Sequence, residues 1–480
     1  MILLETGAAE VPWYSVLPFV AMLACIAVLP LIPKTAHYWE RNSVQLAVAL
    51  TLGIPVAIWM WFLLGHTAVT HSLFEYFQFI MLLFALYTVS GGIYVGGDIR
   101  ATPRNNTIII AIGAVIASFI GTTGAAMLLI RPLLRTNQQR KFRTHSVLFF
   151  IFVVANCGGL LTPLGDPPLF MGYLRGVPFE WTFRLLPEWF FVNALSLITY
   201  YGLDRMHYSK EKPEALVSDA TQVVPVRIHG KLNFLFLAVI IGAVALNVPS
   251  LDLHAIDAGT ATAMSWIPWR ELLFLGACLA SYFLGDRWAR KTGNQFTWGP
   301  ILEVAAIFIG IFLTMIPALR FLGQVAPQLP LNDITFFLFS GGLSSVLDNA
   351  PTYATFFEMA RVLGEGMQGV PMVAGVPESF LVAISLGSVF CGALTYIGNG
   401  PNFMVKAVAE SFGVPMPSFG GYVVKSFTYL VPSLLAMMCI FIAEPLWVKG
   451  IGVALSLLLI GRALFLTMKY RPDPDGPRPG

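Results

Sequence analysis

NCGGLLTPLGDPPLF, residues 156–170, decides the fold, because it places one aspartate among glycines and prolines inside a long apolar region. An ionisable side chain at membrane depth costs about 2.5–3.5 kcal/mol on insertion scales, so Asp166 is by default a functional residue. Pro163, Pro167 and Pro168 donate no backbone hydrogen bonds, and irregular backbone is tolerated in a membrane only inside protein or beside an aqueous cavity. The stretch therefore predicts a broken membrane helix around Asp166.

The composition predicts an all-α polytopic membrane protein. Of 480 residues, 56% are hydrophobic and 11% charged, and the mean hydropathy is +0.73. The apolar runs approach the roughly 20 residues of a spanning helix, whereas a β-barrel would show alternating segments of about ten. The lipid bilayer is thus the expected partner. A net charge of +3 gives no reason to expect nucleic acid. The five cysteines have unrelated spacings and are expected to be core residues, and no cofactor is expected.

Basic loops predict the orientation of the chain. The segment before the first apolar run has no Lys or Arg, so that run is expected to stay as a span and not to be a cleaved signal. The positive-inside rule then predicts that the N-terminus lies outside and the C-terminus in the cytoplasm. The expected location is the cell's inner membrane. About eleven spans and two re-entrant hairpins are expected. The spans are predicted near 14–32, 44–64, 77–95, 145–175, 185–204, 232–248, 271–284, 298–316, 379–412, 425–443 and 446–468.

The first hairpin is predicted from a contradiction in the loop charges. The run 107–130 lies between two basic segments, one with Arg100 and Arg104 and one that begins at Arg131, so both of its ends face inside. Gly121-Thr122-Thr123-Gly124 lies past its middle and provides the turn. The alternative is a mislocated basic loop. A second hairpin is predicted over 333–360, where Leu347-Asp348-Asn349-Ala350-Pro351-Thr352 interrupts the apolar run.

An internal repeat relates the two interrupted spans. TPLGDPPLF, which begins at Thr162, aligns without a gap with TYIGNGPNF, which begins at Thr395, at an offset of 233 residues (395 − 162). The predicted division is a first inverted half, a cytoplasmic linker, a second half, and an extra span with a disordered proline-rich tail: 1–204, 205–231, 232–443 and 444–480. Inverted repeats with Gly/Pro-interrupted segments indicate a secondary transporter with a midplane site. In the alternative, the prolines only kink packed helices.

The acids in the breaks indicate a cation as the transported species. Asp166 and Asp348 lie in the breaks of opposite halves. Two converging carboxylates favour cations, and one of them can exchange a proton near neutral pH. Carbonyl, Thr and Asn oxygens are ligands for hard cations such as sodium. Glu303, only a few residues into its span, is expected to be a solvated or interfacial carboxylate.

Two motifs resemble a known family. NCGGLLTPLGDPPLF, together with SGGLSSVLDNAPTYATFF at 340–357, resembles the NhaD-type sodium/proton antiporters of the ion-transporter superfamily. That superfamily also includes arsenite-pump subunits and sodium-coupled dicarboxylate carriers. The resemblance covers most of the chain. It implies a homodimer, a scaffold domain, and a mobile domain of two hairpins and two broken helices that gives elevator-type alternating access.

The resemblance also implies two cation sites. The first would consist of residues from hairpin one and the first break: Thr122, Thr123, Asn156, Thr162 and Asp166. The second would consist of residues from hairpin two and the second break: Asp348, Asn349, Thr352, Thr395, Asn399 and Asn402. The dicarboxylate carriers have Ser-Asn-Thr at both hairpin tips, whereas this chain has Gly-Thr-Thr and Asp-Asn-Ala. This departure favours exchange of sodium or lithium for protons over carboxylate binding.

Two other functions remain open at this point. In a sodium-coupled di- or tricarboxylate symporter, for example for citrate, the aspartates would hold sodium and an anion would lie between the hairpins. An intramembrane aspartyl protease would need two aspartates on facing continuous helices. Here each aspartate lies in a Pro-containing break, and the first break is duplicated with Asn399 in place of the acid. A transporter without enzymatic activity is therefore the expectation.

Overall fold

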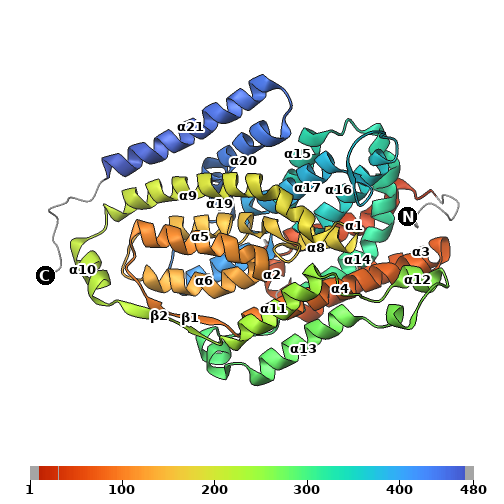
Figure 1. Cartoon of the computed structure of the whole chain (residues 1–480), viewed down its shortest axis with the longest axis horizontal. Helices are drawn as coiled ribbons and strands as arrows, with labels where there is room; N and C mark the ends of the chain where they lie inside the picture. Colours follow the sequence, from red (N-terminus) through yellow and green to blue (C-terminus); the bar gives the residue numbers. More distant parts are fainter. Residues whose placement is uncertain (1–9, 31, 40, 471–480) are drawn as a thin grey trace.

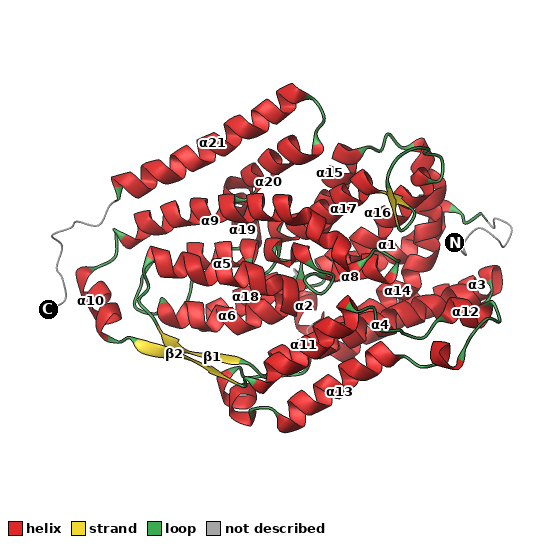
Figure 2. Cartoon of the chain, viewed as in Figure 1, coloured by secondary structure: helices red, strands yellow, loops and turns green. Residues whose placement is uncertain are grey.

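The computed structural model describes residues 10–30, 32–39 and 41–470, and these residues are mostly helical (Figure 2). The prediction of a disordered tail concerns residues 471–480, which lie outside the described residues. Helices of the first part are α1 (Leu17–Val28), α2 (Pro33–Trp39), α3 (Asn42–Leu64), α4 (His66–Ser90), α5 (Pro103–Ile120), α6 (Thr122–Thr136), α7 (Thr144–Val153), α8 (Pro167–Leu174), α9 (Leu186–Tyr208) and α10 (Pro213–Thr221). Helices of the second part are α11 (Leu232–Ala245), α12 (Leu253–Asp257), α13 (Trp269–Leu284), α14 (Gly299–Val325), α15 (Asp333–Val346), α16 (Asn349–Gly364), α17 (Glu378–Cys391), α18 (Gly400–Ser411), α19 (Phe419–Tyr429), α20 (Val431–Met437) and α21 (Leu446–Lys469).

The helices confirm an all-α polytopic membrane protein. Six helical segments of the described chain are long and apolar enough to cross a membrane, or seven if the bent pair formed by Phe419–Tyr429 and Val431–Ile442 is one span. Shorter apolar helices accompany them, among them Leu232–Ala245 and Asp333–Val346. Because hairpins and broken helices divide much of the apolar sequence into pieces of 8–16 residues, such as α8 and α16, long spans are fewer than the apolar runs suggest.

Both predicted hairpins are present. A side chain at Gly113 on α5 would lie 3.2 Å from Leu129 Cδ1 on α6, although a continuous helix would separate residues 16 positions apart by about 24 Å. The chain therefore turns back at Gly121, whose φ of +81° suits glycine. In the second hairpin, the rings of Phe336 on α15 and Phe356 on α16 lie 6.3 Å apart. We call α5–α6 hairpin 1 and α15–α16 hairpin 2.

Several boundaries differ from the prediction. The polar segment 66–76, predicted to lie outside the spans, forms the first turns of α4, and the predicted span 77–95 ends at Ser90. Residues 94–98 instead form β1 (Tyr94–Asp98), which pairs antiparallel with β2 (Val224–His229). The predicted linker 205–231 thus contains the end of α9, all of α10, and β2. Long-range strand pairing leaves no local hydropathy signal, so the pairing of β1 with β2 could not be predicted from the apolar runs. A second, two-residue ribbon pairs β3 (Met372–Val373) with β4 (Val376–Pro377).

Two groups of helices surround the breaks. Helices α3, α4 and α14 pack together, with the rings of Phe79 and Phe308 stacked at 4.9 Å, and α4 also contacts α11 and α13. We call α1, α3, α4, α11, α13 and α14 the frame. The two hairpins, the broken helices and α9 form the second group, next to which α21 lies along α9 (Figure 1). The breaks are buried inside this second group.

Candidate functional site

The two breaks follow the same backbone path. In the first, α7 leads to a 3₁₀ turn (Cys157–Leu161), an irregular segment at 162–166, and α8. In the second, α17 leads to a 3₁₀ turn (Gly392–Leu394), the segment 395–399, and α18. Thr162 and Thr395 have φ, ψ values of −141°, 158° and −134°, 168°. Asp166 and Asn399 have −143°, 143° and −154°, 137°. The gapless alignment at an offset of 233 is therefore structurally correct.

Glycines allow the chain to cross itself in each break. A Cβ at Gly165 would collide with the carbonyl oxygen of Gly159, and a Cβ at Gly398 would lie 2.6 Å from that of Gly392. These two glycine pairs are themselves related by the offset of 233. The close approach ends the 3₁₀ turn and directs Asp166 and Asn399 to the start of the following helix, where each is the N-cap residue.

Both hairpin tips converge on the Asp166 carboxylate. Thr122, the first residue of α6, donates its hydroxyl to Asp166 Oδ1 at 3.0 Å. Asn349, the first residue of α16, donates Nδ2 to Asp166 Oδ2 at 2.6 Å. Asn399 of the second break donates Nδ2 to Oδ1 at 3.2 Å. Asp166 is only 1% exposed. The two predicted groups of site residues thus meet at one carboxylate.

A chain of buried asparagines extends from this carboxylate. Asn399 Nδ2 also donates to Asn156 Oδ1 at 3.2 Å, and Asn156 Nδ2 donates to Asn402 Oδ1 at 2.7 Å. Asn402 Nδ2 in turn donates to the carbonyl oxygens of Gly392 (2.8 Å) and Thr395 (2.9 Å). The amides therefore fix the two breaks against each other. We call Asp166, Thr122, Asn349, Asn399, Asn156 and Asn402 the central network.

The remaining predicted residues lie around the central network. Thr162 donates its hydroxyl to the Ser118 carbonyl on α5, and Thr395 donates to the Ser345 carbonyl on α15. Thr352 Oγ1 donates to the Asp348 carbonyl at 3.0 Å. Thr162 and Thr395 fasten the hairpins to the breaks, whereas Thr352 bonds the carbonyl four residues earlier at the start of its own helix. Thr123 follows Thr122 on α6 and is half-buried.

The second predicted acid has a different environment from the first. Asp348 accepts a hydrogen bond from its own helix, at Ala350 N (3.1 Å), and remains partly exposed. Asp166 is buried and bonded from three directions, so the acids are not equivalent. Glu303, expected at an interface, is exposed and accepts a hydrogen bond from Gln45 Nε2 at 3.0 Å.

Sequence reasoning missed the serines that bind the breaks. Ser118 Oγ donates to the Gly158 carbonyl and accepts from Leu161 N, and Ser344 Oγ donates to the Ser388 carbonyl. Ser118 lies three residues before Gly121, and Ser345 lies three residues before Asp348. An alignment of the two hairpin tips by themselves would have paired Ser118 with Ser345, whose carbonyl oxygens accept from Thr162 and Thr395, but would have missed the hydroxyl of Ser344.

The central network contains the groups that a hard cation requires. Buried polar atoms are almost always paired, yet Asn349 Oδ1 is buried without a hydrogen-bond partner. It belongs to the amide whose nitrogen contacts Asp166. A carboxylate and an unpaired amide oxygen are oxygen ligands of the kind that sodium binds. The three side chains bonded to Asp166 are uncharged, so a cation there would face a negative charge without a competing lysine or arginine. Among the described residues, no group of three or more His, Cys, Asp or Glu side chains could hold a metal ion.

Comparison with known proteins indicates membrane transport. A family model described as "Putative citrate transport" matches residues 8–442. An uncharacterised transporter of Mycobacterium bovis is 24% identical over 335 residues, which cover 66% of this chain and 72% of that protein. An uncharacterised transporter of Mycobacterium tuberculosis matches with the same identity and coverage.

Proposed function

The chain belongs to the membrane transporter family of that model, and we propose that it exchanges sodium or lithium for protons at the central network. The observation that supports this proposal best is the buried Asp166 carboxylate beside the unpaired Asn349 oxygen. A cation bound there would gain the charge of Asp166 and a neutral oxygen ligand. A proton on Asp166 would neutralise the same charge. The two species would therefore compete for one carboxylate, which is the requirement for exchange.

Both hairpin tips contact this carboxylate, which suggests how access would alternate. An ion on Asp166 is covered by Thr122 on one hairpin and by Asn349 on the other. Displacement of the hairpins and breaks relative to the frame would open the site to either side. We propose this elevator-type motion, a homodimeric assembly, and an inner-membrane location with the N-terminus outside and the C-terminus in the cytoplasm. The division into inverted halves at 205–231 stays a prediction.

A carboxylate symporter is the second candidate, and the description of the family favours it. In that mechanism Asp166 would hold sodium, and a citrate-like anion would bind next to it. The three side chains that bond Asp166 are a hydroxyl and two amides, which could also face an anion held through sodium. A direct lysine or arginine contact to the anion is not part of this network.

Everted membrane vesicles distinguish the two functions. We expect added sodium or lithium to collapse a preformed proton gradient, and we expect Asp166→Asn to abolish the collapse while the protein still inserts. Glu303→Gln, at an exposed acid, is the matched control and should retain activity. Gradient-driven citrate or succinate uptake without cation-dependent proton efflux would contradict the exchange mechanism and support the symporter.

A further inference from the structure

Arg270 of the frame lies against α8, the helix that follows the first break. Asp166 is the N-cap residue of α8, and Phe170 and Tyr173 lie one and two turns farther on. The guanidinium carbon of Arg270, on α13, lies 6.0 Å from the centre of the Phe170 ring and 5.5 Å from that of the Tyr173 ring. Arg270 is 5% exposed, and an aromatic face attracts a cation most strongly when the cation is shielded from water. The arginine therefore attracts α8 to the frame.

The frame holds this arginine in place. Glu271 Oε1 accepts hydrogen bonds from Arg270 Nε at 3.0 Å and from Nη2 at 2.8 Å. Ser250 Oγ donates to Glu271 Oε2 at 2.7 Å, and Gln78 Nε2 on α4 donates to Ser250 Oγ at 2.9 Å. This chain of bonds joins α13 to α4 and balances the charge of Arg270. Both rings over which Arg270 lies come from α8, so the contact joins the frame to the first break.

Two further polar contacts join the same end of α8 to the frame. Tyr173 Oη donates to Asn247 Oδ1, just after α11, at 2.9 Å. Arg175, directly after α8, donates Nη2 to Glu75 Oε2 on α4 at 3.2 Å. We call the residues that make these contacts the α8–frame contact: Phe170, Tyr173, Arg175, Glu75, Asn247 and Arg270.

A cavity of about 490 Å³ lies beside the α8–frame contact. Its walls include Leu174 of α8 and, on the side of the frame, Glu75, Gln78, Asn247 and Arg270. A polar cavity of this size can hold several water molecules, since each takes about 30 Å³. Water can replace the polar contacts when α8 separates from the frame, whereas tightly packed apolar side chains would have no such substitute. The α8–frame contact is therefore of a kind that can separate and form again.

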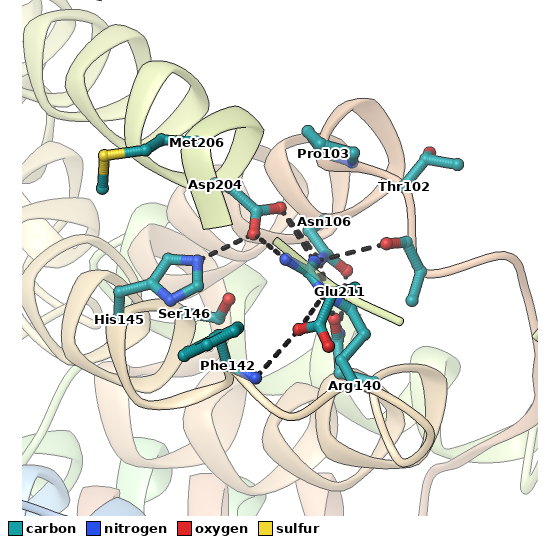
Figure 3. A network of polar contacts seen from close by, with 12 residues as sticks. Thr102, Pro103, Asn106, Arg140, Phe142, His145, Ser146, Asp204, Met206 and Glu211 are labelled. Atoms are coloured by element: carbon teal, nitrogen blue, oxygen red, sulfur yellow. Dashed lines mark hydrogen bonds and ion pairs between the residues drawn. The ribbon is translucent and has the colours of Figure 1, made fainter. Parts of the chain in front are cut away.

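A buried cluster fastens hairpin 1 to α7 and α9 (Figure 3). Arg140, after α6, donates Nη2 to Asp204 Oδ1 at 2.5 Å and Nη1 to Oδ2 at 3.1 Å. Asn106 of α5 donates Nδ2 to Asp204 Oδ2 at 3.2 Å, and His145 Nε2 lies 2.7 Å from Oδ1. Asp204 belongs to α9 and His145 to α7, which leads into the first break. Hairpin 1 should therefore move together with the first break.

Hairpin 2 is joined to α8 itself. Asn349, the first residue of α16, bonds Asp166 at the start of α8 at 2.6 Å. Farther along both helices, a Cβ at Gly172 would lie 2.5 Å from the hydroxyl oxygen of Tyr353, so α8 and α16 touch there as well. The two hairpins and the first break thus form one body, and the position of α8 sets the position of this body relative to the frame.

We propose that Arg270 is a positioning residue, which holds α8, and with it Asp166 and both hairpins, in the position against the frame that the structure shows. The inference rests on the proposed displacement of the hairpins and breaks relative to the frame, and it is independent of the solute that is carried. Displacement of α8 would withdraw both aromatic rings from the guanidinium and break the ion pair of Arg175 with Glu75. Loss of Arg270 should therefore make this position less populated.

Disulfide formation measures the population of this position. A Cβ at Gly323 on α14 would lie 3.3 Å from Val362 Cγ2 on α16, so Gly323→Cys/Val362→Cys can cross-link the frame to hairpin 2. A Cβ at Gly113 on α5 would lie 3.1 Å from Cγ1 of Val154, directly after α7, so Gly113→Cys/Val154→Cys is a matched pair within the second group. Both pairs are oxidised in membranes, and the single-cysteine variants give the background from the native cysteines. The measured quantity is the rate for the first pair divided by the rate for the second.

Variants of the arginine assign the effect. We expect Arg270→Gln/Glu271→Gln, which removes both charges of the buried pair together, to lower this ratio several-fold. Arg270→Lys keeps a cation beside the rings and should retain most of the ratio. Arg290→Gln is the matched control, because Arg290 is also 5% exposed and lies 5.2 and 5.4 Å from the rings of Tyr282 and Phe296. Neither of these rings comes from the second group, so the ratio should equal that of the unmodified chain.

A ratio that does not change after Arg270→Gln/Glu271→Gln, or that falls equally after Arg290→Gln, would overturn the proposal. If the double variant does not insert, Phe170→Leu tests the same contact from α8, because it removes one ring and leaves the pair of Arg270 with Glu271 intact. The ratio should again fall, and an unchanged ratio would overturn the proposal. Cross-linking is measured without an ion gradient, so a lack of sodium-dependent proton release would contradict the proposed exchange and leave this inference standing.

Discussion

Gly165 has no room for a side chain, because the backbone of Gly159 lies against its Cα. We expect Gly165→Ala to lower the stability of the protein by about 1–3 kcal/mol, the usual cost of overpacking a tight site. The measurement is the apparent Tm in detergent, followed by gel filtration after heating. Gly400→Ala is the control, since a Cβ at Gly400 meets no atom within 4 Å. Equal Tm values for the two variants would show that the first break can relax.

Thr122 and its neighbour Thr123 allow a test of whether the hydroxyl that bonds Asp166 contributes to cation binding. Thr122 donates to Asp166, whereas the three side chains that bond Asp166 do not include Thr123. A hydrogen bond to a charged group contributes about 1.5–3 kcal/mol, so Thr122→Val should weaken apparent cation affinity by roughly tenfold or more. Thr122→Ser should restore most of it, and Thr123→Val should leave it within about twofold. The measurement is the sodium concentration that gives half-maximal proton release from vesicles. Equal effects of Thr122→Val and Thr123→Val would contradict the role of the hydroxyl.

The broken helices and hairpins are the elements that the sequence predicted best. Each has a strong local cause: Gly121 between two apolar runs, and TPLGDPPLF and TYIGNGPNF at matching positions. The structure gives matching dihedral angles at two aligned pairs of the breaks, Thr162 with Thr395 and Asp166 with Asn399. Proline and glycine act on the chain within a few residues, so their effect can be read without knowledge of the fold.

Elements that depend on distant partners could not be predicted in the same way. β1 pairs with β2 across more than 120 residues, and the polar start of α4 has no apolar signature. The contact of Asn349 with Asp166 spans 183 positions, so the two residues were assigned to separate groups although their side chains meet at one carboxylate. The cluster of Arg140, Asp204 and His145 was missed for the same reason. Its members come from separate loops and helices, and only the fold brings their side chains into contact.

At the scale of the whole molecule, alternating access requires hairpin 1 to move against the frame. Hairpin 1 meets the frame where α6 passes the end of α4: a Cβ at Gly124 would lie 3.2 Å from the Cβ of Ser90. Within the frame, a Cβ at Gly53 on α3 would lie at the same distance, 3.2 Å, from the Cβ of Leu313 on α14. Both distances are slightly shorter than the range of about 3.5–4.5 Å found in disulfides, so each pair needs the same small outward shift to form one.

Because the two Cβ–Cβ distances are equal, a cross-link within the frame is a matched control for a cross-link between hairpin 1 and the frame. We expect the double substitution Ser90→Cys/Gly124→Cys to form a disulfide that stops transport in oxidised vesicles, with activity restored by a reductant. Gly53→Cys/Leu313→Cys should form as readily and leave transport unchanged, because both residues belong to the frame. If the first disulfide forms completely and transport continues, hairpin 1 does not move against α4. The site at Asp166 would then have to open through the hairpin tips alone, at Thr122 and Asn349, with the body of hairpin 1 fixed.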